Sequence, residues 1–168
     1  MKESLQKAEQ REREMALITN DCLEKILNGK IETHPQTQNS GIITGSLSYP
    51  SESLPENMTI CAFNTITKTQ YCTNKHPSDS RYKYGKGYKL VVPPGDYYLY
   101  YKLDPNEKAI DALYGEIVNK LGYSDTIKPF LVRIREGITY TPKVDPDGWR
   151  GRITGEWGGM YLQCEELK

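Results

Sequence analysis

Apolar and polar residues follow two different periods along the chain, and the period changes near Gly41. Before that residue, apolar side chains recur at three- and four-residue steps: Met15, Ile18, Cys22 and Ile26. This spacing predicts one amphipathic helix over residues 3–28, which the pair Asn28-Gly29 ends. The polar, proline-containing stretch at 30–40 predicts a linker. We therefore divide the chain into a helix at 1–29, a linker at 30–40 and a folded domain at 41–168.

The first half of the predicted helix, KAEQREREM, carries charge on all sides. It fits a solvated helix held by pairs of glutamate and arginine along its own surface. It also fits a stalk or self-association helix that joins the domain to something upstream. The sequence leaves both readings open.

Beyond Gly41 the apolar period is two, which predicts strands. The predicted strands cover residues 41–49, 58–63, 69–73, 87–92 and 96–103. In the last of them, alternate residues share a face that we assign to the core: Tyr97, Leu99, Tyr101 and Leu103. Tyr98 and Tyr100 fall on the opposite face.

The stretch DPNEKAIDALYGEIVNKLG, residues 104–122, carries the signals of a second helix. Asp104 is a suitable N-cap, Pro105 suits the first helical position and Gly122 the end. After it, residues 129–135 and 138–144 predict a hairpin across Glu136-Gly137, and 160–164 a last strand. The predicted fold is mainly β: an antiparallel β-sandwich with one inserted helix and an N-terminal helix.

Several short motifs resemble the prealbumin-like, carboxypeptidase-regulatory-like β-sandwich family. They are Gly45, Tyr49-Pro50-Ser51-Glu52, Pro55, Ala62, Val92-Pro93-Pro94-Gly95, Tyr97 and, in VDPDGW, an Asp-Pro-x-x-Trp element. The resemblance covers about residues 41–149 and is closest to bacterial exported or lipoprotein members without an assigned activity. It implies a transthyretin-like sandwich that acts as an accessory module. Transthyretin-like hydrolases of the urate pathway need catalytic histidines and a Tyr-Arg-Gly-Ser tail, whereas this chain has only His34 and His76 and ends in QCEELK.

Charge and hydropathy narrow the classes of partner. Lys and Arg number 22, as do Asp and Glu, so no overall field attracts nucleic acid. The basic and aromatic residues of RYKYGKGYK, 81–89, therefore fit a solvated strand edge better than a nucleic-acid site. No stretch is apolar enough to span a bilayer, and no export signal is visible at the start.

Two cysteines suggest a covalent link across a hairpin. When residues 58–73 are folded about Ile66-Thr67, Cys61 falls opposite Cys72, a separation that a disulfide can close. The alternative is that both thiols are free. A redox motif would need Cys-x-x-Cys spacing and a zinc site two further ligands, and neither is present. A disulfide favours an extracytoplasmic location, in the periplasm or at the cell surface, with the export signal removed; a cytoplasmic location is the alternative. Cys22 and Cys164 either pair or remain free as small apolar residues.

Aromatic side chains supply the candidate binding surface. Tyr98 and Tyr100, with Tyr84 or Tyr88, can form a stacking face for a glycan or a protein, or simply fill the strand. Trp149 and Trp157 flank a glycine-rich loop, and we expect one in the core and the other in a site. The turn DPDG at 145–148 lacks the remaining ligands of a calcium loop.

No catalytic motif is present, so we expect no enzyme activity, no cofactor and no metal. The first functional hypothesis is a non-catalytic accessory β-sandwich of an exported or envelope-associated protein. It would act in protein–protein interaction or structural assembly, with an unknown partner or by self-association through the N-terminal helix. The alternative is a carbohydrate-binding module that uses exposed tyrosine and tryptophan.

Overall fold

The computed structural model describes residues 2–35, 39–47, 58–82, 85–121, 124–142, 149–155 and 160–167. Within these residues the protein is mainly β, with one α-helix, α1 (Lys2–Leu27), and a 3-10 turn, η1 (Glu165–Leu167). A small sheet has the order β10-β2-β5, with β2 (Gly41–Ser46), β5 (Gly87–Val92) and β10 (Thr139–Tyr140). A large sheet has β1-β4-β3-β6-β7-β8-β12 as its main path. Its strands are β1 (Lys30–Ile31), β3 (Thr59–Asn64), β4 (Thr69–Thr73), β6 (Gly95–Lys102), β7 (Ala112–Leu121), β8 (Ser124–Pro129), β9 (Val132–Ile134), β11 (Trp149–Arg150) and β12 (Tyr161–Leu162).

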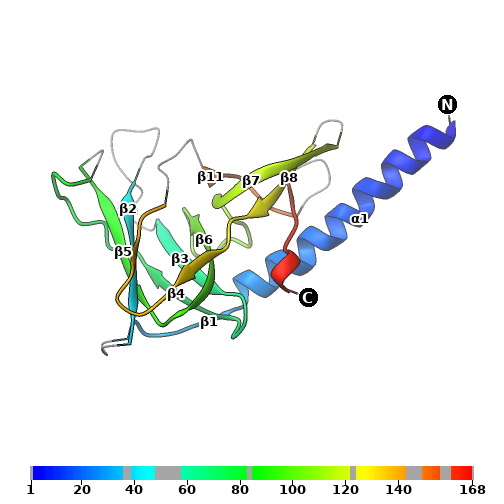
Figure 1. The fold of residues 1–168 in the computed structure, drawn as a ribbon. Helices are drawn as coiled ribbons and strands as arrows, with labels where there is room; N and C mark the ends of the chain where they lie inside the picture. The colour runs from blue at the N-terminus through cyan, green and yellow to red at the C-terminus, as the bar shows by residue number, and fades with distance from the viewer. Residues whose placement is uncertain are drawn as a thin grey trace.

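The large sheet is the middle one of three layers (Figure 1). The small sheet packs on one face, and this first core contains Ile43, Ile60, Leu90, Tyr97 and Leu99 among others. The C-terminal half of α1 and the last segment of the chain cover the other face, where the second core contains Ile26, Phe63, Tyr98, Tyr100, Leu113 and Leu162 among others. Strands in the middle layer are therefore apolar on both faces, as strands buried on two sides must be.

Strand β6 shows this alternation most clearly. Tyr97 and Leu99 point into the core beneath the small sheet, as their period-two spacing predicts, and Tyr101 packs against that core. Tyr98 and Tyr100 point to the opposite side, into the core beneath α1. The β-sandwich prediction and the first five predicted strands are confirmed.

The inserted helix predicted at 104–122 is wrong. Most of its second half forms β7, which pairs with β6, β8 and β11. The residues that looked like a helix start form a tight turn instead, because the carboxylate of Asp104 accepts the N–H of Asn106 at 2.9 Å. In β7, Leu113 points into the core beneath α1 and Tyr114 into the other core, so pairing and burial on two faces override the helical spacing.

The hairpin predicted for residues 129–144 is wrong as well. β9 pairs with β6 in the large sheet, whereas β10 runs parallel to β2 in the small sheet. The turn between them holds a hydrogen bond from the N–H of Ile138 to the carbonyl of Arg135, at 3.1 Å. The chain therefore crosses from one layer to the other at this turn. The last predicted strand is present as the shorter β12, parallel to β8.

Helix α1 is confirmed almost at its predicted bounds, but its buried face is shifted. The side chains that bury against the second core belong to Thr19, Cys22, Leu23 and Ile26. Ile18, which the sequence placed in the apolar stripe, is 47% exposed. The segment expected to be a linker also contains a strand, because β1 pairs with β4 at Lys30↔Thr69 and Ile31↔Gln70.

Candidate functional site

The stacking surface predicted from Tyr98 and Tyr100 is wrong. Tyr98 is 0% exposed and Tyr100 is 2% exposed, because α1 and the last segment of the chain lie over this face of the sheet. The hydroxyl of Tyr100 donates to Oε1 of Gln70 at 2.5 Å, and burial raises the pKa of this phenol. These tyrosines fill a core, so they offer no face to a glycan.

Of the remaining predicted aromatic residues, the two that the structure describes, Trp149 and Tyr88, belong to the first core. Trp149 is partly buried and packs against the first core, with its ring centroid 5.3 Å from that of Tyr114. Tyr88 is 3% exposed in the same core. Trp157, Tyr84 and the turn at 145–148 lie outside the described residues.

The cysteines lie where the sequence placed them. Cys61 pairs with Cys72 across β3 and β4, next to Ala62↔Tyr71 and Phe63↔Gln70, in the register expected from folding the stretch about its midpoint. The carbonyl of Cys72 faces away from β3, because it accepts a hydrogen bond from His34 on the other side. The pair is therefore a non-hydrogen-bonded one, where strands approach most closely. The two sulfur atoms form a disulfide, with the Cα atoms 4.1 Å apart.

A second disulfide joins Cys22 of α1 to Cys164 after β12, with Cα atoms 6.0 Å apart. It fastens the helix to the end of the folded domain. All four cysteines are paired, so none supplies a thiol for redox or metal chemistry. Across the described part of the chain, no group of three or more His, Cys, Asp or Glu side chains is placed to hold a metal ion.

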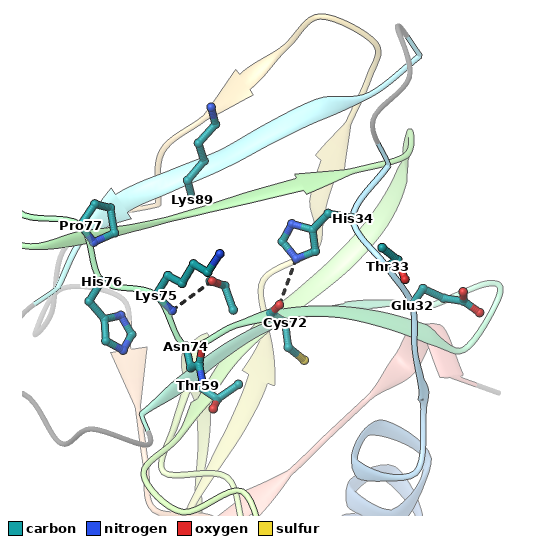
Figure 2. Close-up of a pocket in the computed structure, with 11 residues that line it drawn as sticks. Glu32, Thr33, His34, Thr59, Cys72, Asn74, Lys75, His76, Pro77 and Lys89 are labelled. Carbon is teal, nitrogen blue, oxygen red and sulfur yellow. Dashed lines mark hydrogen bonds between the residues drawn. The ribbon is translucent and has the colours of Figure 1, made fainter.

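A groove of about 1040 Å³ opens between the edge of β4 and the edge of β5 (Figure 2). His34 lies between the two strand edges, far from either strand in sequence. Its Nε2–H donates to the carbonyl of Cys72 at 3.0 Å, and its Nδ1 accepts the N–H of Val91 at 3.4 Å. One nitrogen donates and the other accepts, which is the pattern of the neutral ring. The imidazole therefore joins the two layers of the sandwich at this end of the groove.

The opposite side of the groove is formed by residues 73–77. Nε2 of His76 hydrogen-bonds to the carbonyl of Met58 at 2.8 Å, and its Nδ1 is buried with no partner among the described residues. Lys75 is exposed, and its side chain extends toward the middle of the groove (Figure 2). Both histidines of the chain thus line one groove.

Sequence reasoning placed His34 in the linker at 30–40 and His76 between the strands predicted at 69–73 and 87–92, and it missed this site. Neither residue belongs to a local motif, because their hydrogen-bond partners lie in distant segments of the chain: Cys72 and Val91 for His34, and Met58 for His76. Only the pairing of β1 with β4 brings residue 34 to the strand edges.

The N-terminal half of α1 forms a second feature with a free surface. Residues 5–11 are all exposed, and Leu5 and Leu17 are 65% and 70% exposed. This half of the helix extends away from the sheets (Figure 1). Among the described residues of α1, Thr19 is the first whose side chain is buried.

The chain matches no protein-family model, and no curated protein matches it. Membership of the prealbumin-like family therefore stays a prediction. Among the described residues, no helix has the length and apolar character needed to cross a membrane.

Proposed function

We propose that the protein is a non-catalytic accessory β-sandwich that acts in protein–protein interaction or structural assembly. The projecting half of α1 is the element that makes the contact, either with a second copy of the chain or with a partner protein. The observation that carries this proposal is the division of α1 into a half that packs on the domain and a half that projects from it (Figure 1). The C-terminal half is fixed by burial of Cys22, Leu23 and Ile26 and by the disulfide to Cys164.

In the projecting half of α1, residues 5–14 belong to neither core. Among its side chains, Nε2 of Gln10 donates to the carboxylate of Glu14 at 3.2 Å, an exposed contact within one helical turn. Such contacts stabilise a helix by only about 0.2–0.5 kcal/mol each, and most helical stability in proteins comes from packing. A partner that covers Leu5 supplies this packing.

The two disulfides support the proposed location. They persist in oxidising compartments and are rare in a reducing cytosol. We therefore place the protein outside the cytoplasm, in an exported or envelope-associated assembly. The prealbumin-like resemblance agrees with this role, because such sandwiches serve mostly as accessory modules.

The test is to remove residues 2–14, which leaves Cys22 and the buried part of α1 in place. We expect the full chain to self-associate, or to be cross-linked to a partner in an envelope fraction, and the shortened chain to do neither. Its thermal unfolding should stay unchanged, because residues 5–14 belong to neither core.

Point variants sharpen this experiment. Leu5→Glu should weaken the association, because it places a charge in the apolar contact. The matched variant Gln6→Glu adds the same charge at the neighbouring position and should weaken it less. The proposal is wrong if the shortened chain keeps the oligomeric state and partner capture of the full chain.

A further inference from the structure

On the edge of β5 that faces the groove, one residue has backbone groups without a partner among the described residues. The N–H of Gly87 donates to the carbonyl of Pro77 at 3.1 Å, and the N–H of Val91 donates to His34. Both groups face away from β2. Backbone groups alternate along a strand, so the N–H and carbonyl of Lys89, midway between them, face the groove as well. No described residue bonds to either group of Lys89.

The edge of β4 on the other side of the groove offers one more donor. The carbonyl of Cys72 is occupied by His34, but its N–H, which faces the same way, has no partner among the described residues. The groove therefore contains two free donors, at Cys72 and Lys89, and the free carbonyl of Lys89. A donor and an acceptor on a single residue are what one residue of an extended peptide satisfies in a β-ladder.

The charges that line the groove are unevenly paired. The carboxylate of Glu32 lies 3.6 Å from the ammonium of Lys30. No carboxylate of the described residues lies within ion-pair distance of Lys75 or Lys89, both of which are exposed. The side chain of Lys75 extends into the groove, whereas the side chain of Lys89 extends from β5 away from Lys75 (Figure 2). Positive charge without a counter-charge favours a negatively charged occupant.

We propose that this groove binds a short, extended, acidic segment of a partner protein, which pairs its backbone with Lys89 and places a carboxylate at Lys75. His34 and Pro77 occupy the edge of β5 at either end, so the paired stretch is short. A volume of about 1040 Å³ is large enough for such a segment. The inference does not rest on the role proposed for α1, because the groove contains no residue of that helix.

The direct test uses two synthetic peptides, acidic TEVEVET and its charge-reversed counterpart TKVKVKT, with isotope-labelled full-length protein. We expect the acidic peptide alone to shift the amide resonances of Cys72, Lys89 and Val91. It should also slow hydrogen exchange of the Lys89 amide, because strand pairing buries that N–H. Equal binding of both peptides, absence of binding, or resonance shifts confined to α1 would each overturn the proposal. Binding that leaves exchange at Lys89 unchanged would overturn the strand pairing.

Charge-reversal variants test whether peptide binding depends on the groove or on surface charge in general. Lys75→Glu should weaken binding of TEVEVET about fivefold to tenfold, since it replaces an attraction by a repulsion at an exposed site. Lys108→Glu makes the same change in net charge at an exposed position outside the groove and should leave the affinity unchanged. Lys75→Gln should give an intermediate loss, and both lysine side chains are exposed, so the fold tolerates these changes. If Lys75→Glu and Lys108→Glu weaken binding equally, the groove is not the site.

Discussion

The side-chain oxygen of Thr19 accepts the N–H of Leu162 at 2.8 Å, inside the layer between α1 and β12. The same hydroxyl donates back to the carbonyl of Leu162 at 3.4 Å. Both residues are 0% exposed. A single threonine thus satisfies both backbone groups of one residue in the last strand, next to the disulfide that joins the same two segments.

Replacing this threonine tests how strongly the helix is held. Thr19→Val keeps the shape but leaves the buried N–H of Leu162 without an acceptor, which should lower the free energy of unfolding by about 1–3 kcal/mol. Thr19→Ser retains the oxygen and should cost less, about 1 kcal/mol for the lost methyl group. Denaturant unfolding measures both. Equal losses in the two variants would show that the hydrogen bond contributes little.

The two disulfides should differ in their contribution to stability. Partners that are 142 residues apart close a much longer loop than partners 11 residues apart. In the chain-entropy account, removing Cys22–Cys164 as a double alanine variant costs about 5 kcal/mol and removing Cys61–Cys72 about 3 kcal/mol. Denaturant unfolding of the two double variants compares them, and intact mass with and without reductant checks the bonds first. The reverse order of stability would contradict the loop-length argument.

Tyr100→Phe should destabilise the protein even though it removes only one oxygen. The hydroxyl of Tyr100 satisfies Oε1 of Gln70, whose Nε2 donates to the carbonyl of Gly29 at 2.8 Å just after α1. Gln70 is 2% exposed, so its amide oxygen would be left unpaired in the interior. We expect a loss of about 1–3 kcal/mol in the free energy of unfolding. An unchanged denaturation midpoint would mean that water reaches Gln70 in the variant.

Stability should fall at alkaline pH because of buried tyrosines. Burial raises the pKa of Tyr97 to about 12, above its ordinary value near 10, and raises the pKa of Tyr88 and Tyr100 as well. Above about pH 10 the unfolded chain releases these protons and the folded chain retains them, so unfolding becomes more favourable. The contribution of Tyr97 is complete below about pH 10 and lost as the pH rises through about 12.

The variant Tyr97→Phe isolates this effect. Between about pH 10 and pH 12 its stability should fall less steeply than that of the unchanged protein, by up to about 1.4 kcal/mol per pH unit. Unfolding curves at a series of pH values, with tyrosinate absorbance recorded in parallel, provide the measurement. Parallel pH profiles for the two proteins would contradict a raised pKa at Tyr97.

Local patterns in the sequence predicted the β3–β4 hairpin down to its register. A short turn at Ile66-Thr67 leaves little choice of pairing, and alternation on both sides fixes which residues face each other. Helix α1 was predictable for the same reason, since its apolar residues recur at helical spacing and Asn28-Gly29 marks its C-terminal end. The sequence therefore predicts those features that depend only on neighbouring residues in the chain.

Features that depend on distant segments were missed. The exposure of Tyr98 and Tyr100 could not be judged without knowing that α1 lies over β6. The residues from Asp104 onward carry both helix-start residues and apolar spacing, and only pairing with β6 and β8 decides for the strand β7. The groove escaped notice because His34 meets Cys72 and Val91 through tertiary structure alone.

The bond between Cys22 and Cys164 makes most of the chain a covalent ring from which the first part of α1 protrudes as a tail. A protease that cuts once anywhere inside the ring leaves a single molecule, whose two fragments separate only after reduction. A cut in the protruding tail, by contrast, releases a peptide at once. Limited proteolysis would therefore detach the proposed contact element while leaving the ring, and the groove within it, covalently intact.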